Sequence, residues 1–301
     1  MEQIKNKFIM GTDIEIIINA DLQEGKILED IEKSFNIFYS LEKDFSRFSK
    51  TSDLSILNKN KSLKVSERFI DVLKLSKEVY ETTDGFFNPL INISNIGYSE
   101  SFEKIKDHPL APSLLRRGNG EDLNVHKIKI IGDEIILEKN QNLDFGGIVK
   151  GYCVDLVKNY LLEKGYDDFI INAGGDIFVN KTSCIAIDSP FENDDIFALL
   201  DLKNKSLSTS GTYKRNWKID KKNYHHILNP NNNENNNEII SISLISDKCY
   251  LSDCYATSCI AMGISKSIDF LEKQNIDGII IGKDGKIYKI GNLDKYAFEI
   301  I

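Results

Sequence analysis

The stretch L-D-F-G-G-I-V-K-G-Y-C-V-D, residues 143–155, places two glycines after an acid and a Lys-Gly pair shortly after them. A glycine pair loses backbone entropy on folding and adds no side-chain packing, so it is typical of a tight turn or of a close approach to the main chain. Residues 151–164 then carry apolar side chains at helical spacing, up to Gly165. The stretch therefore predicts a glycine turn leading into a helix, either for packing alone or to receive a bound group.

Strand and helix patterns precede this turn in the N-terminal half of the chain. Residues 9–19 alternate into a β-branched run and predict a strand. Residues 22–46 and 65–82 carry apolar side chains at helical spacing, and Ser66 is placed to cap the second helix. Residues 126–138 alternate on both sides of a Gly-Asp pair, which predicts a hairpin.

The C-terminal half continues the mixture. Residues 167–180 predict a buried strand that breaks at a second glycine pair and resumes, and residues 197–211 and 238–246 predict further strands. Residues 249–263 predict a short buried helix that begins with cap-forming residues and ends at a glycine. A Lys-Asp-Gly turn at 283–285 predicts another hairpin.

Strands and helices are mixed without the strict alternation of a doubly wound sheet. This pattern favours an α+β fold with largely antiparallel sheets flanked by helices. No internal repeat or low-complexity linker marks a boundary, so we expect a single domain over residues 1–301, as one body or as two lobes with the site between them.

Composition excludes several classes of function. A net charge of −8 argues against nucleic acid as a partner, because phosphate binding needs clustered Lys and Arg. The sequence contains no run of 18 apolar residues, so no transmembrane segment is predicted, and the first residues lack a secretory signal pattern. The chain as given is expected to be cytoplasmic; the alternative is an exported or membrane-associated protein whose signal segment has been removed. The five cysteines contain no Cys-x-x-Cys pair and indicate neither a disulfide framework nor a zinc site.

Asp253 and Thr257 lie four residues apart on the predicted helix 249–263, so their side chains leave one face. In isolation, such an Asp is usually a helix cap and such a Thr often bonds back to the preceding turn. The pair is also a hard oxygen-donor set of the kind that Mg²⁺ takes, with neutral oxygens and a substrate phosphate completing the shell. The glycine turn could supply a main-chain carbonyl and hold pyrophosphate, with Lys150 adding positive charge.

Polar, loop-like motifs recur along the chain where packing alone does not require them. In order they are Met10-Gly11-Thr12, Phe45-Ser46-Arg47-Phe48 leading to Ser55 and Asn58, Asp84-Gly85-Phe86-Phe87-Asn88-Pro89, residues 144–155, Asn172-Ala173-Gly174-Gly175-Asp176, Thr209-Ser210-Gly211, His226-Ile227-Leu228-Asn229-Pro230 and Asp253-x-x-Ala256-Thr257. Eight motifs in this order, over nearly the whole chain, resemble the FAD:protein FMN transferase family, called ApbE. The chain departs from the family pattern at Val149, where Ala is usual, and at Asn88 and Asn229, where Asp is usual.

The resemblance implies an ApbE-like α+β fold and a Mg²⁺-dependent enzyme with FAD as substrate. The FMN half of FAD would be attached through a phosphoester to a Ser or Thr of a partner flavoprotein, with release of AMP. Two alternatives stay open: a Mg²⁺-dependent FAD pyrophosphatase, in which water replaces the acceptor hydroxyl, and a non-catalytic flavin-binding protein.

The resemblance also implies roles for individual residues. The metal ligands would be the side chains of Asp253 and Thr257 and the carbonyl of Gly147. The residues expected to contact FAD are Met10, Phe48, Phe86, Phe87, Asn88, Asp144, Lys150, His226 and Ile227, although Phe87 also fits a core or rim position. The expected catalytic residues are Asp253, Thr257, Lys150 and His226. For His226 the role of general base, phosphate donor or structural residue stays open, and His225 matches the motif less well.

Overall fold

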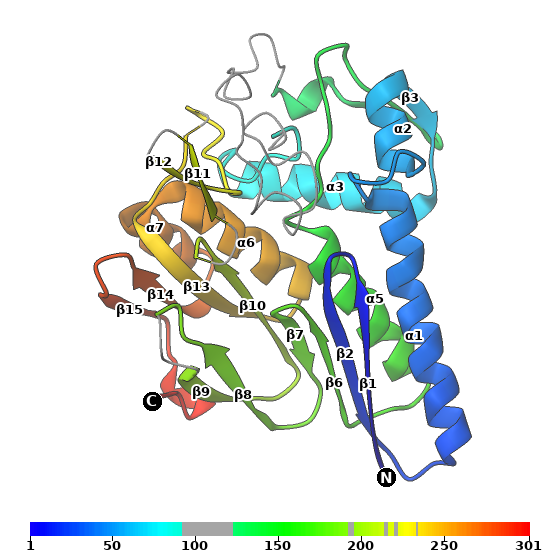
Figure 1. The fold of residues 1–301 in the computed structure, drawn as a ribbon, viewed down its shortest axis with the longest axis vertical. Coiled ribbons are helices and arrows are strands. Elements are labelled where there is room, and N and C mark those ends of the chain that lie inside the picture. The colour runs from blue at the N-terminus through cyan, green and yellow to red at the C-terminus, as the bar shows by residue number, and fades with distance from the viewer. Residues whose placement is uncertain (92–122, 192–195, 214–215, 220–221, 233) are drawn as a thin grey trace.

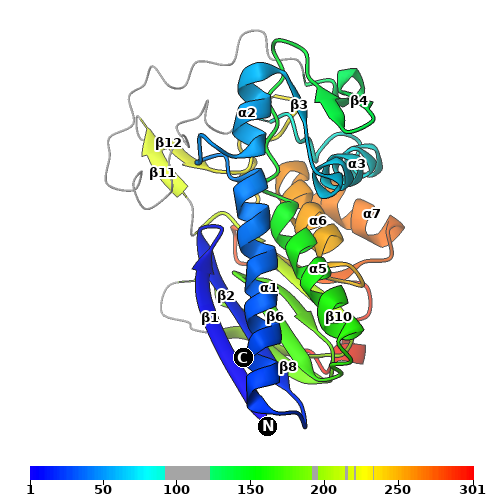
Figure 2. The same cartoon turned by 90° about the vertical axis from the view of Figure 1, so that its right-hand side faces the viewer.

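The computed structural model has three layers: four helices, a large sheet and a small sheet (Figures 1 and 2). The residues that it describes are 1–91, 123–191, 196–213, 216–219, 222–232 and 234–301. Figure 2 shows α1 (Glu24–Phe45) in front of the large sheet, with α5 (Val149–Glu163) beside it. Two apolar cores result, one between helices and large sheet and one between the two sheets.

The large sheet has eight strands, and every neighbouring pair is antiparallel, as predicted. Across the sheet the strands are β1 (Glu2–Ile9), β2 (Thr12–Asn19), β6 (Phe169–Ala173), β7 (Asp176–Val179), β10 (Lys205–Gly211), β13 (Ile239–Ser246), β14 (Asp277–Gly282) and β15 (Ile287–Ile290). The second glycine pair forms the turn between β6 and β7, which places it at one end of the sheet.

The helices cover one face of the large sheet and the small sheet covers the other. The covering helices are α1 (Glu24–Phe45), α5 (Val149–Glu163), α6 (Cys249–Met262) and α7 (Ile264–Lys273). The small sheet consists of β8 (Ser183–Asp188), β9 (Ile196–Leu202) and β16 (Glu299–Ile300). Within the ranges given above, no helix combines the length and the apolarity needed to cross a bilayer.

The remaining elements gather beyond one end of the large sheet (Figure 1). They are α2 (Asp53–Asn60), α3 (Glu67–Thr82), the three-stranded sheet of β3 (Ser62–Lys64), β5 (Glu134–Ile136) and β4 (Lys129–Ile131), a 3₁₀ turn at Val125–Lys127, and the hairpin of β11 (Asn216–Ile219) and β12 (Lys222–His225). A second 3₁₀ turn, Asp294–Tyr296, lies near the C-terminus. As predicted, Ser66 caps α3 by accepting a hydrogen bond from Phe69 N–H.

The predicted strand 9–19 is instead a hairpin. Met10 and Gly11 form its turn with φ values of 57° and 73°, a left-handed pair that matches the twist of a two-residue hairpin. β1 escaped prediction because it is the edge strand, whose largely exposed side chains show no apolar alternation.

The start of α6 also differs from expectation. Lys248 occupies the cap position of α6, and its side chain accepts no hydrogen bond from the helix. The N–H groups of Cys249 and Tyr250 donate instead to the carboxylate of Asp155, on α5. The prediction that α6 begins with its own cap residues is therefore wrong, because a side chain from another helix satisfies these groups.

Candidate functional site

A cavity of about 560 Å³ opens where the start of α5, the middle of α6 and the β6–β7 turn meet. Ten of the twelve predicted site residues line it: Phe86, Phe87, Asn88, Asp144, Gly147, Lys150, His226, Ile227, Asp253 and Thr257. Its volume lies in the range of small-molecule sites, and its wall combines charged and apolar groups. The motifs that are scattered through the sequence thus converge on one cavity.

Met10 and Phe48 lie elsewhere in the described structure. Met10 N–H donates to Glu42 Oε1 at 2.8 Å, and the Met10 side chain packs against the main core. Phe48 is 49% exposed, and its ring centroid lies 4.8 Å from the guanidinium carbon of Arg47. Neither side chain is among the described residues that line the cavity.

Two hard oxygen donors, Asp253 and Thr257, line the cavity together with Gly147 of the glycine turn. Asp253 and Thr257 project from adjacent turns of α6, and a Cβ built on Gly147 would lie 3.4 Å from Thr257 Oγ1. The main chain of the glycine turn therefore reaches the threonine hydroxyl, which also lies 3.5 Å from Ser210 Oγ. A carboxylate, a hydroxyl and a nearby main-chain carbonyl form the donor chemistry that suits Mg²⁺.

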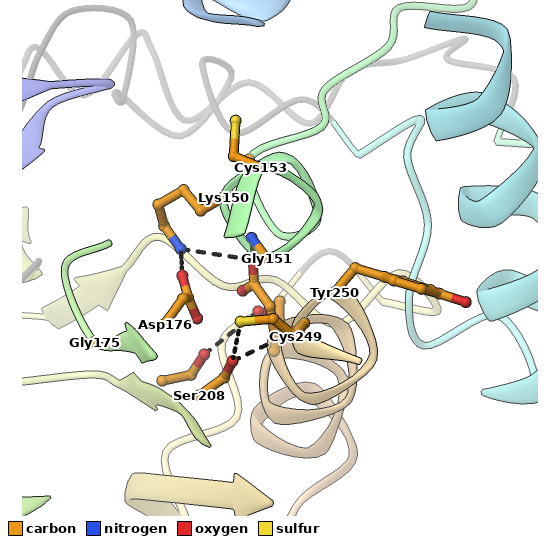
Figure 3. Close-up of polar contacts among 12 residues, drawn as sticks. Lys150, Gly151, Cys153, Gly175, Asp176, Ser208, Cys249 and Tyr250 are labelled. Carbon is orange, nitrogen blue, oxygen red and sulfur yellow. Dashed lines mark hydrogen bonds and ion pairs between the residues drawn. The ribbon is translucent and has the colours of Figure 1, made fainter. Parts of the chain in front are cut away.

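The charges around Asp253 support this fit. The Lys150 ammonium pairs with Asp176 and lies 3.6 Å from Asp253 Oδ2, as Figure 3 shows for the lysine and Asp176. Burial raises the pKa of Asp253 and the Asp176 carboxylate raises it further, while Lys150 and Gly151 N–H oppose both effects. Two buried carboxylates thus share this ammonium, and a divalent cation would supply further positive charge. No group of three His, Cys, Asp or Glu side chains suited to a metal occurs in the part of the chain that the structure describes, so the fit rests on one carboxylate with neutral oxygens.

The glycine turn is held by one side chain from α2 and one from the segment between α1 and α2. Asn58 brackets Leu143, donating to its carbonyl at 2.8 Å and accepting from its N–H at 2.7 Å. Arg47 donates to Asp144 Oδ2 at 2.6 Å, and the other oxygen of Asp144 accepts Gly146 N–H at 2.8 Å. Asp144, predicted as an FAD contact, therefore also shapes the turn.

Residues Phe86–Asn88 form one wall of the cavity. The Asn88 amide donates to Leu123 O at 3.0 Å and accepts from Leu90 N–H at 2.9 Å, which ties down its own loop. Phe87 is almost fully buried, so its ring contributes to the core as well as to the cavity wall.

Several motif residues without a predicted role line the cavity or pair with a residue of its lining. Arg47 and Asp176 pair with predicted site residues, and Gly174, Gly175, Thr209 and Ser210 line the same wall. The signal that could have found them was their position inside the motifs Ser-Arg-Phe, Asn-Ala-Gly-Gly-Asp and Ser-Thr-Ser-Gly. Their pairing depends on contacts between distant elements, which spacing along the chain does not reveal.

His226 lines the cavity, whereas the neighbouring His225 is buried behind it. His225 Nδ1 accepts from Ile227 N–H at 3.3 Å and faces the Asn235 amide nitrogen, also at 3.3 Å. His225 Nε2 lies 3.0 Å from Asn236 O, so the ring is neutral with its proton on Nε2. This ring holds the loop that presents His226 and Ile227 to the cavity.

Folding is expected to become less favourable in mild acid because of His225. Burial is the main cause that lowers the His225 pKa from 6.5 to about 4; the Asn236 carbonyl opposes the shift and Lys283 adds to it. The unfolded chain therefore takes up the proton first. The neutral His225 ring contributes about 3 kcal/mol to the free energy of unfolding above pH 6.5, and this contribution is lost as pH falls towards 4. Urea unfolding at pH 7.5 and pH 4.5 measures this loss. The free energy of unfolding should fall less between the two pH values for His225→Gln than for the parent protein, and equal falls would contradict this assignment.

A family model and two named relatives match most of this chain. The model of the ApbE family matches residues 10–280. The chain is 29% identical over 291 residues to the FAD:protein FMN transferase of Buchnera aphidicola subsp. Baizongia pistaciae, covering 88% of this chain and 82% of that protein. It is 28% identical to the FAD:protein FMN transferase of Klebsiella pneumoniae, over 74% and 72% of the two chains.

Solved structures share the fold. The ApbE protein of Thermotoga maritima superposes with a TM-score of 0.87 at 20% identity, over 98% of this chain and 99% of that chain. The flavin transferase ApbE from Vibrio cholerae superposes with a TM-score of 0.81 at 20% identity, over the same shares. The α+β architecture with its antiparallel sheet is therefore the one that these proteins adopt.

Proposed function

The chain belongs to the ApbE family, and on that premise we propose that it is a Mg²⁺-dependent FAD:protein FMN transferase. The enzyme takes FAD, attaches FMN through a phosphoester to a Ser or Thr hydroxyl of an acceptor flavoprotein, and releases AMP. Support comes from relatives that carry the name FAD:protein FMN transferase. The observation that carries the proposal is the convergence of Gly147, Asp253 and Thr257 beside Lys150 in the cavity lining.

The side chains of Asp253 and Thr257 and the carbonyl of Gly147 would hold Mg²⁺. When bound, the ion neutralises charge on the pyrophosphate and polarises its phosphorus for attack. Lys150 is placed to add a second positive charge, since its ammonium lies within ion-pair distance of Asp253. The aromatic wall of Phe86 and Phe87 gives a flat heterocycle an apolar surface to pack on.

The reaction breaks the phosphoanhydride bond of FAD and forms a phosphoester bond. The acceptor oxygen forms a bond to the FMN phosphorus, the bond from that phosphorus to the bridging oxygen breaks, and AMP leaves with the bonding electrons. The proton of the acceptor hydroxyl must go to a base, and His226 in the cavity wall would take this role. Most of the acceleration comes from positioning and charge stabilisation, because the enzyme forms no covalent bond itself.

Mass spectrometry of an acceptor protein tests the proposal. An acceptor with an Asp-x-x-Ser/Thr segment, incubated with this enzyme, FAD and Mg²⁺, should gain the mass of FMN less one water and release one AMP for each adduct. The gain should disappear with EDTA, and also when the acceptor Thr is replaced by Val.

Two other results would each overturn the transferase assignment. Cleavage of FAD to FMN and AMP without an adduct on any acceptor would identify a pyrophosphatase. Binding of FAD that stays intact in the presence of Mg²⁺ would identify a flavin-binding protein.

A further inference from the structure

We propose that Asp155, together with Gly151, fixes the axial position of α6 against α5 and so brings Asp253 and Thr257 to the main chain of Gly147. Asp155 is then a positioning residue for the metal, although it lies outside the cavity lining. The inference rests on the proposed function, because it concerns the ligands of the metal that this function requires.

Gly151 allows the two helices to touch. A Cβ built at Gly151 would lie 2.7 Å from both Cys249 O and Tyr250 Cα, distances that real Cβ atoms do not adopt. Figure 3 shows Gly151 on α5 facing Cys249 at the start of α6. Gly151 N–H also points at Asp253 Oδ2, at 3.3 Å. The same residue therefore contacts the start of α6 and one of the proposed metal ligands.

Asp155 lies one helical turn beyond Gly151 on α5 and is bound to the same end of α6. Its two carboxylate oxygens accept the N–H groups of Cys249, at 3.1 Å, and Tyr250, at 3.0 Å. The side chain is largely buried, and Lys158 donates to it at 3.0 Å. Since α6 has no side-chain cap of its own, this carboxylate satisfies its first N–H groups and complements its dipole.

The contacts form a series along α5. Gly147, in the turn before the helix, approaches Thr257; Gly151 approaches Asp253 and the helix start; Asp155 holds the first N–H groups. A shift of α6 along its axis would break the Asp155 bonds and separate Thr257 from Gly147 at the same time. This coupling explains why an acid follows the glycine turn at a spacing of two helical turns.

Metal binding by an Asp155→Asn variant tests the inference. Asparagine keeps the volume and one acceptor, but its amide NH₂ would face an N–H group that it cannot satisfy. We expect the Kd for Mn²⁺, measured by electron paramagnetic resonance with Asp253→Ala as the background, to rise about tenfold, the size found when outer-shell partners of a metal site are removed. The half-saturating Mg²⁺ concentration for FMN transfer should rise by the same factor while the KM for FAD stays constant.

Two further variants separate positioning from stability. Asp30 is fully buried and accepts the hydroxyls of Tyr160 and Tyr166 at 2.6 and 2.9 Å, so Asp30→Asn should lower the Tm without changing Mn²⁺ affinity. Adding Lys248→Asp to Asp155→Asn gives α6 a cap of its own. The double variant should regain Tm while its Mn²⁺ affinity stays low, because the link to α5 is still missing.

Three results would overturn the inference. One is wild-type Mn²⁺ affinity in Asp155→Asn, and another is recovery of that affinity by Lys248→Asp. The third is a parent protein that binds no Mn²⁺ above the Asp253→Ala background, which would also remove the proposed function. In the first two cases the parent still binds metal and transfers FMN, so the two failures are distinguishable.

Discussion

Asp253→Asn is expected to reduce FMN transfer by at least about 10²-fold, the loss typical of removing one preorganised electrostatic group. The substitution removes the anionic metal ligand and keeps the shape of the side chain. Its amide oxygen can still accept Gly151 N–H, which lies 3.3 Å from Asp253 Oδ2 in the parent protein. Transfer to the acceptor, followed by mass and by AMP release at saturating Mg²⁺, measures the loss.

The same substitution is expected to stabilise the protein in metal-free buffer, by on the order of 1 kcal/mol. The reason is the raised pKa of Asp253, which has burial and the Asp176 carboxylate as its main causes. A carboxyl whose pKa is raised on folding contributes most below its unfolded pKa of 3.8, and this contribution is lost as pH rises through the folded pKa. The Asp253→Asn variant carries an amide that does not titrate, so it does not lose stability in this way as pH rises.

Thermal unfolding in EDTA at pH 5 and pH 8 distinguishes the outcomes. The gain in Tm from Asp253→Asn should be larger at pH 8 than at pH 5, and Mg²⁺ should raise the Tm of the parent protein but not that of the variant. A variant that is less stable than the parent at pH 8 in EDTA would contradict the electrostatic account, whatever its activity. A matched Thr257→Val variant, which removes a neutral ligand, should lose Mg²⁺ binding without this pH-dependent gain.

Gly174→Ala is expected to destabilise the protein by about 3 kcal/mol and to abolish FAD binding. Gly174 has φ of 63°, where a side chain costs about 1–2 kcal/mol. A Cβ at this position would also lie 2.0 Å from Thr12 Oγ1, so the β6–β7 turn and the first residue of β2 would have to separate. Overpacking of this kind adds about 1–3 kcal/mol. Both Gly174 and Thr12 line the cavity, so their separation changes its shape.

Urea denaturation with two companion variants isolates the steric part. Gly165 has φ of 85° and nothing within 4 Å of a built Cβ, so Gly165→Ala should show the backbone cost alone, about 1 kcal/mol. Thr12→Ala in the Gly174→Ala background should recover part of the loss, because it removes the overlapping hydroxyl. Equal losses for Gly174→Ala and Gly165→Ala would show that Thr12 moves aside without cost.

Local sequence was sufficient for most of the elements and for the list of chemical groups. Apolar periodicity predicted α1, α3 and α5, and the terminal glycine marked the end of α6. The Gly-Asp and Lys-Asp-Gly turns predicted two hairpins because turns depend on neighbouring residues alone. The Asp253 and Thr257 pair was predictable because helical geometry places residues four apart on one face. These inferences concern interactions within a few residues.

Tertiary structure alone decided which groups meet. The cap of α6 comes from Asp155, more than ninety residues earlier, and Lys150 on α5 pairs with Asp176 on β7. Met10 and Phe48 share motifs with cavity residues yet lie outside the cavity in the described structure. The physical reason is range: turn and helix preferences act along the chain, whereas burial, ion pairing and helix contact depend on how segments far apart in the sequence pack together.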